Sequence, residues 1–123
     1  MRRDRFRAEA VYPLHNWRGL PAGKMAVRPG PVLAATDEMR ITIRGRGGHG
    51  AMPHLTADPV VAAAQVITAL QTIASRNANP LDSIVVSVCS METSQLGTFN
   101  VIPGHVLLVG TVATFKPETR ELG

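Results

Sequence analysis

A strictly alternating run near the middle of the chain places the strongest limit on its fold. Residues 39–44 read Met-Arg-Ile-Thr-Ile-Arg, so that every second side chain is apolar. This is the period of a β-strand with one buried and one solvent-exposed face. Residues 45–50 follow as Gly-Arg-Gly-Gly-His-Gly, a loop whose glycines permit backbone angles that other residues avoid. The pattern predicts a strand in a sheet that is covered on one face only.

A helix is predicted to begin at Asp58-Pro59 and to run to about Arg76. Aspartate can accept the unpaired amide hydrogens of a first helical turn, and proline is tolerated at the first helical position. Asn77, Asn79 and Pro80 should end this helix. An apolar stripe at helical spacing marks its buried face, and its members are Val60, Ala63, Ile67, Leu70 and Ala74.

Two further strands are predicted at residues 83–92 and 106–115, because both runs are rich in β-branched residues. Residues 116–121 then resemble the start of a second helix. This order of elements is typical of an α+β fold, a two-layer sandwich with helices on one face of a mainly antiparallel sheet. Such an architecture is expected to have one more strand after the last helix, so we expect the chain to be truncated at both ends.

Length and composition predict one compact domain with an appendage. The chain has 123 residues, of which 45% are hydrophobic, enough for one apolar core and too few for two complete domains. The first third contains one short apolar run and a tract rich in glycine and proline from Gly19 to Pro31. We expect this part to consist of strand ends and connections, because it cannot form a core alone.

The single cysteine, Cys89, excludes an internal disulfide framework and favours a reducing, cytoplasmic setting. It lies in an apolar run, where a thiol is expected to act as a small hydrophobe. No stretch approaches the roughly 20 apolar residues of a membrane span, and the N-terminus does not resemble an export signal. A net charge of +4 is weak evidence for a nucleic acid partner, since four arginines in residues 2–7 supply much of it.

Residues 45–50 also match the Gly-x-Gly-x-x-Gly pattern of a dinucleotide-binding turn. That interpretation fails because no helix opens there and no acidic residue lies near position 70 to hold a ribose. The arginines and glycines are also compatible with an RNA-binding segment, but only 4% of the residues are aromatic and could stack on bases.

Four histidines are present, at positions 15, 49, 54 and 105, and none forms a helical His-Glu-x-x-His pair or a Cys-His zinc spacing. A single histidine is more often a surface or core residue than a ligand. His49 is the strongest candidate, because flanking glycines leave it accessible. It could donate a hydrogen bond to a substrate oxygen.

Three segments together resemble one known family. They are Leu14-His15-Asn16-Trp17-Arg18-Gly19-Leu20-Pro21-Ala22-Gly23, then Gly45-Arg46-Gly47-Gly48-His49-Gly50-Ala51-Met52-Pro53-His54 with Asp58-Pro59, and Phe99-Asn100-Val101-Ile102-Pro103. Their order and spacing are similar to those of the hippurate hydrolase, aminoacylase and auxin-conjugate amidohydrolase group of metallopeptidases. The resemblance covers nearly the whole chain.

In that family a catalytic domain binds two metal ions, and an inserted lid domain with a ferredoxin-like fold mediates homodimerisation. The resemblance therefore implies that residues 1–33 are a remnant of the catalytic domain and that residues 34–123 are the lid. His15 matches a family metal ligand, whose imidazole would bind a divalent ion such as zinc or manganese. The remaining ligands and the glutamate base are missing, so we expect this chain alone to be inactive and to bind no metal stably.

His49 matches the lid histidine that reaches into the active site of the partner subunit and stabilises the oxyanion. Asn100 matches an asparagine that helps to hold the substrate, an N-acyl amino acid. Two residues depart from the pattern. Ala113 replaces an arginine that clamps the substrate carboxylate, which puts carboxylate recognition in doubt. Gly50 replaces a more frequent alanine.

The resemblance therefore implies the lid and dimerisation segment of a metal-dependent amidohydrolase, without a nucleic acid or membrane partner. A second hypothesis is a stand-alone homodimerising or binding module that pairs through an open sheet edge. A third is a basic RNA-binding domain, which would bind single strands in a salt-sensitive manner.

Overall fold

The computed structural model describes residues 9–95 and 97–122, which divide into two units between Gly30 and Pro31. In the first unit, the described residues 9–30 contain turns but no helix or strand. The amide of Leu20 donates to the carbonyl oxygen of Trp17, and that of Lys24 to Pro21. All of these residues are exposed, as expected for a segment without a core of its own. Arg2, Arg3, Arg5 and Arg7 lie outside the described residues.

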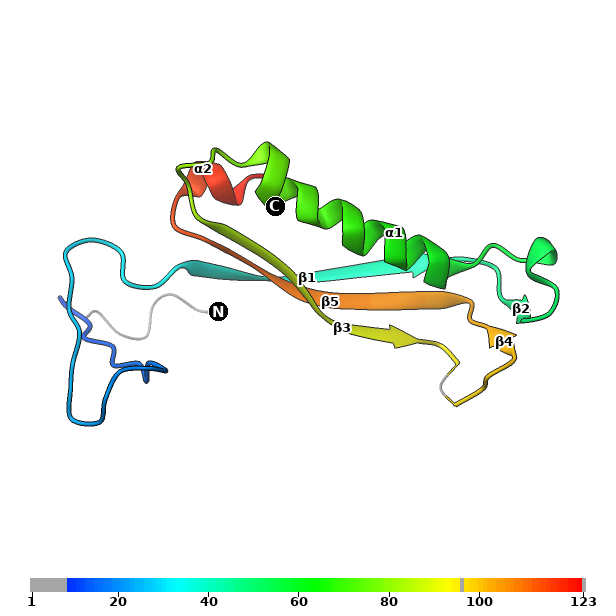
Figure 1. Cartoon of the computed structure of the whole chain (residues 1–123), viewed down its shortest axis with the longest axis horizontal. Helices are drawn as coiled ribbons and strands as arrows, with labels where there is room; N and C mark the ends of the chain where they lie inside the picture. Colours follow the sequence, from blue (N-terminus) through cyan, green and yellow to red (C-terminus); the bar gives the residue numbers. More distant parts are fainter. Residues whose placement is uncertain (1–8, 96, 123) are drawn as a thin grey trace. The chain divides into compact units, whose positions relative to one another are not determined.

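The second unit is built on a three-stranded antiparallel sheet. Its strands are β1 (Ala35–Arg44), β3 (Ile84–Thr93) and β5 (His105–Thr114), in the spatial order β1-β5-β3 (Figure 1). Ile41 lies opposite Leu108, and Ile43 opposite Val106. The predicted α+β fold with an open antiparallel sheet is confirmed, and each strand lies within four residues of its expected position.

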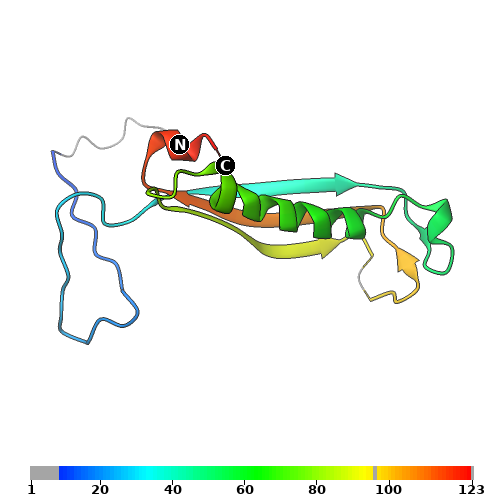
Figure 2. The same cartoon turned by 45° about the horizontal axis from the view of Figure 1, so that its top comes forward.

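Helix α1 (Pro59–Thr72) lies along one face of this sheet and continues as a π-helical turn, η2 (Ile73–Asn77) (Figure 2). It begins as predicted, because a side-chain oxygen of Asp58 accepts a hydrogen bond from the amide of Val60 at 2.8 Å. Three short elements complete the opposite end from α2 (Pro117–Arg120): β2 (Gly48–His49), η1 (Pro53–Leu55) and β4 (Val101–Ile102).

The core lies between α1 and the sheet. Ala63, Val106 and Leu108 are fully buried. Partly buried side chains pack around them, namely Ile41, Ile43, Val60, Val66, Ile67 and Val88. Ala74, which was expected on the buried stripe, is exposed instead. The π-helical turn explains this difference, because its wider turn changes the angular spacing of side chains after Thr72.

Cys89 corrects a second expectation. It was predicted to be a small hydrophobe, and it is exposed. The register of β3 against β5 shifts between Val88 and Ser90, so Cys89 is the extra residue of a β-bulge. A bulged residue has no partner in the ladder, and the apolar alternation around it no longer sets its direction. The Cys89 thiol donates to the carbonyl oxygen of Ser87.

Two ion pairs hold α2 and its N-cap residue, one to β1 and one to the turn before β3. The Arg120 guanidinium binds the Asp37 carboxylate of β1 through two nitrogens, one of them at 2.5 Å. Lys116 pairs with Asp82, whose other carboxylate oxygen accepts a hydrogen bond from the Thr119 hydroxyl at 3.3 Å. The hydrogen bond from Arg120 lowers the pKa of Asp37 below its ordinary 3.8, and that from Lys116 does the same for Asp82.

Acid is therefore expected to loosen α2. A carboxylate whose pKa is lowered by folding stabilises the folded form above its unfolded pKa, and this contribution disappears as the pH falls through the lowered value. We expect the NMR chemical shifts of Thr119 and Arg120 to move toward unstructured values below about pH 4, while those of the core strands stay in place. In the double variant Asp37→Asn, Asp82→Asn this transition should be absent, and its persistence would show that other groups hold α2.

Candidate functional site at the tip of the sheet

His49 and Asn100, which are far apart in the sequence, are brought together by a small second sheet. In it β2 pairs antiparallel with β4, with His49 opposite Val101. The amide of Gly50 donates to the carbonyl oxygen of Asn100 at 2.7 Å, one step beyond this register. We call residues 45–57 together with 99–104 the tip. The backbone hydrogen bonds of the tip fix the backbone positions of His49 and Asn100, from which the two side chains project.

The two halves of the tip touch at Gly47 and Gly50, and glycine is required at the first of these positions. A Cβ atom at Gly47 would lie 2.5 Å from the carbonyl oxygen of Ile102, which real structures essentially never show. A Cβ atom at Gly50 would lie 3.1 Å from the carbonyl oxygen of Asn100, a contact that demands a small shift of its neighbour. Gly50 thus lets the His49 loop approach Asn100 closely without this shift.

The His49 side chain is exposed and its hydrogen bonding selects one tautomer. The amide of Ala51 donates to Nδ1 at 3.1 Å. A ring nitrogen that accepts a hydrogen bond carries no proton, so the neutral imidazole holds its proton on Nε2. His49 therefore presents a donor, Nε2–H, on a ring whose orientation is fixed by its own loop. Such a donor can stabilise negative charge that develops on an oxygen.

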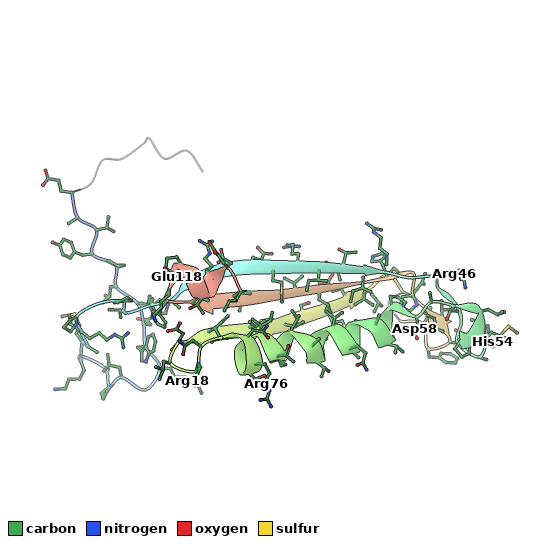
Figure 3. All side chains as sticks on the ribbon, turned by 90° about the horizontal axis from the view of Figure 1, so that it is seen from above. Arg18, Arg46, His54, Asp58, Arg76 and Glu118 are labelled. Atoms are coloured by element: carbon green, nitrogen blue, oxygen red, sulfur yellow. The ribbon has the colours of Figure 1, made fainter. Side chains whose placement is uncertain are left out.

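The loop that carries His49 is closed by Arg46. Its backbone exchanges two hydrogen bonds of 2.9 Å with Ala57, and its Nε donates to the carbonyl oxygen of Leu55 at 3.2 Å. Figure 3 shows Arg46, His54 and Asp58 at the same end of the second unit. The carboxylate of Asp58 already caps α1. The Arg46 side chain and the Asp58 carboxylate are thus both engaged within the protein, the first by the loop and the second by the start of α1.

His15 belongs to the first unit and is exposed. Its Nδ1 lies beside the carbonyl oxygen of Asn16, and its ring makes an edge contact with Trp17, with centroids 6.4 Å apart. Within residues 9–95 and 97–122, no group of three or more His, Cys, Asp or Glu side chains could hold a metal ion. One imidazole does not make a metal site, so the assignment of His15 as a ligand stays a prediction.

Ala113 lies at the opposite end of β5 from the tip. It pairs with Thr36 on one side and Val85 on the other, eight residues beyond His105. Along a strand this separation is about 26 Å. In one subunit, position 113 and His49 therefore cannot contact the same small molecule. Two shallow hollows on the described surface, both lined in part by Arg120, also lie at this α2 end.

Phe99 begins the segment Phe99-Asn100-Val101-Ile102-Pro103, and the sequence predicted no role for its side chain. It immediately precedes Asn100 and its side chain is 100% exposed. The only sequence signal for a role of Phe99 was its place next to a candidate substrate-binding asparagine, and exposure cannot be read from the sequence.

None of the described helices has the length and apolar character needed to cross a membrane.

The fold and the tip define a two-layer α+β domain that brings His49 and Asn100 together at one end, with no group of metal-binding side chains among the described residues. Residues 36–121 match the model of the peptidase dimerisation domain of the M20 family, and the chain belongs to this family. The predicted resemblance to metal-dependent amidohydrolases is thereby confirmed.

Known relatives agree with this assignment. The N-acetyl-L-cysteine deacetylase of Bacillus subtilis (strain 168) is 44% identical over 91% of this chain, which spans 26% of that relative. A protein of methicillin resistant Staphylococcus aureus described as an aminohydrolase superposes with a TM-score of 0.70 at 36% identity, covering 77% of this chain and 24% of its own. The Bacillus subtilis YXEP protein, described as a dinuclear metal binding peptidase, has a TM-score of 0.55 at 33% identity, covering 87% and 24%.

Proposed function

We propose that this chain forms the lid and dimerisation segment of a metal-dependent amidohydrolase, which hydrolyses the amide bond of N-acyl amino acids. The observation that carries the proposal is the exposed Nε2–H donor of His49, whose tautomer is set by the amide of Ala51. The name of the Bacillus subtilis relative, an N-acetyl-L-cysteine deacetylase, supports the substrate class.

His49 is proposed to donate its Nε2–H to the carbonyl oxygen of the scissile amide as that oxygen becomes negatively charged. A donor that is already oriented stabilises this charge without reorganising during the reaction. Asn100, held next to the His49 loop through the amide of Gly50, is proposed to bind the substrate with its side-chain amide. Two divalent ions, zinc or manganese, would supply the activated water. The described residues do not themselves form that metal site, apart from the single predicted ligand His15.

We further propose that the protein is a cytoplasmic homodimer in which His49 serves the active site of the partner subunit. The family to which the chain belongs is named for dimerisation, and an exposed edge strand such as β3 is a ready surface for pairing. The free thiol of Cys89 suits a reducing compartment. Neither a nucleic acid nor a membrane is proposed as a partner.

A lid exchange tests the proposal. Residues 31–122 would replace the aligned lid of the Bacillus subtilis N-acetyl-L-cysteine deacetylase, which supplies the metal site. We expect a dimeric chimera that releases acetate from N-acetyl-L-cysteine, as measured by a coupled acetate assay. The relative with its lid deleted serves as the negative control. A chimera that folds and dimerises without turnover would contradict the proposal and favour a stand-alone dimerising module.

A further inference from the structure

The tip carries an apolar side chain that its own domain leaves uncovered. Phe99 is 100% exposed, more than any other large hydrophobic residue described. Three more large apolar side chains of the tip are exposed, namely Met52 (51%), Leu55 (59%) and Val101 (38%). An aromatic side chain is among the largest apolar groups that a protein can bury. A single exposed apolar residue is common, but several exposed apolar side chains on one small segment are a feature of binding sites.

The backbone that follows Phe99 is held by hydrogen bonds, although the phenyl side chain itself is exposed. The next residue, Asn100, accepts the hydrogen bond from Gly50, and β4 follows at once and pairs with β2. Further along, the amide of Gly104 donates to the Ser94 hydroxyl, and that of Gly45 to the carbonyl oxygen of Gly104. Phe99 is therefore presented by the same hydrogen-bonded frame that orients His49, which lowers the entropic cost of using it in binding.

The chemistry of the tip suits a ligand with two kinds of surface. Its donors, the Nε2–H of His49 and the amide of Asn100, require an oxygen acceptor. Its exposed apolar groups require a hydrophobic part of the same ligand. In an N-acyl amino acid these two parts adjoin, because the carbonyl oxygen and the acyl chain are bonded to the same carbon. The carboxylate lies on the far side of the amide nitrogen.

We infer that Phe99 is a specificity-determining residue that contacts the acyl chain of the substrate when the tip closes over an active site. This inference rests on the proposed function of His49. It assigns the acyl end of the substrate to the tip. It also leaves the amino acid end to other parts of the protein, in keeping with the position of Ala113 at the other end of β5.

The test compares two substrates that differ only in the acyl chain, N-acetyl-L-cysteine and N-hexanoyl-L-cysteine, using the lid chimera. We expect Phe99→Ala to lower the ratio of kcat/KM for hexanoyl over acetyl by about tenfold, the discrimination that the contact of a single methylene with an apolar group supplies. Phe99→Leu should keep most of the ratio. Leu81→Ala is the matched control, because Leu81 is 91% exposed but lies before β3, at the end of the sheet away from the tip.

Three outcomes would overturn the inference. In the first, the ratio does not change in Phe99→Ala. In the second, kcat/KM falls equally for both substrates, which would mean that Phe99 only positions the loop. In the third, Leu81→Ala changes the ratio as much. Thermal unfolding should be unaffected by Phe99→Ala, because the side chain makes no buried contact. If the chimera is active and His49→Ala inactivates it, but Phe99→Ala leaves the hexanoyl-to-acetyl ratio of kcat/KM unchanged, the proposed function survives and only this inference fails.

Discussion

Replacing His49 with alanine is expected to lower kcat of the lid chimera by about 100- to 1,000-fold, the range seen when one oxyanion donor is removed. The loss should appear mainly in kcat, because a donor to the developing oxyanion contributes more in the transition state than in substrate binding. Steady-state kinetics on N-acetyl-L-cysteine would measure it. The variant should fold normally, since His49 is exposed and the backbone pairing of β2 with β4 remains.

His105→Ala is the matched control, because His105 is also exposed but begins β5 outside the tip. Its loss should leave kcat nearly unchanged.

A subunit-mixing experiment determines which active site His49 serves. One subunit carries His49→Ala, and the other carries an inactivated metal site in the catalytic domain of the relative. If His49 acts across the dimer, random pairing should restore roughly a quarter of the parent activity. No recovery in a confirmed heterodimer would place His49 in its own subunit's site.

Replacing Leu108 with alanine is expected to destabilise the second unit by about 2 to 5 kcal/mol. Leu108 is fully buried in the centre of β5, opposite Ile41 of β1, in the same cluster as Ala63 of α1. Removing its methyl groups leaves a cavity that a sheet hydrogen-bonded on both sides of β5 cannot easily close. Urea unfolding followed by circular dichroism would measure the change in the free energy of unfolding.

Leu81→Ala controls for the chemistry of the substitution, because the same side chain is removed from a position that is 91% exposed. Its effect should stay within about 0.5 kcal/mol. Equal losses at positions 81 and 108 would contradict the register of β5 described above. A small loss at Leu108 together with a large one at its partly buried neighbour Leu107 would indicate that the opposite face of β5 forms the core.

The elements with a clear local period were predicted well. Alternation in residues 39–44 indicated β1, and Asp58-Pro59 marked the start of α1, because strand and helix spacing and capping depend on neighbours in the sequence. The strands β2 and β4 were missed, since two residues are too few to show a period. The bulge at Cys89 was missed as well, because it exists only relative to the partner strand.

The candidate site was predicted in its members but not in its arrangement. His49 and Asn100 came from the resemblance of their motifs to a family. Their proximity depends on the pairing of two short strands separated by about fifty residues, and no local pattern reports such a contact. The same holds for Phe99, whose exposure follows from how the tip is folded.

The sequence by itself determined the fold class, the start of α1, the strands of the main sheet and the family of the chain. These properties follow from periodicity, capping and ordered motifs, which are local or simply additive along the chain. Only the tertiary structure decided the rest. It set the tautomer of His49, joined the His49 loop to Asn100 through Gly50, and placed Ala113 at the far end of β5. Those features depend on hydrogen bonds and close backbone contacts that form only after distant segments have packed together.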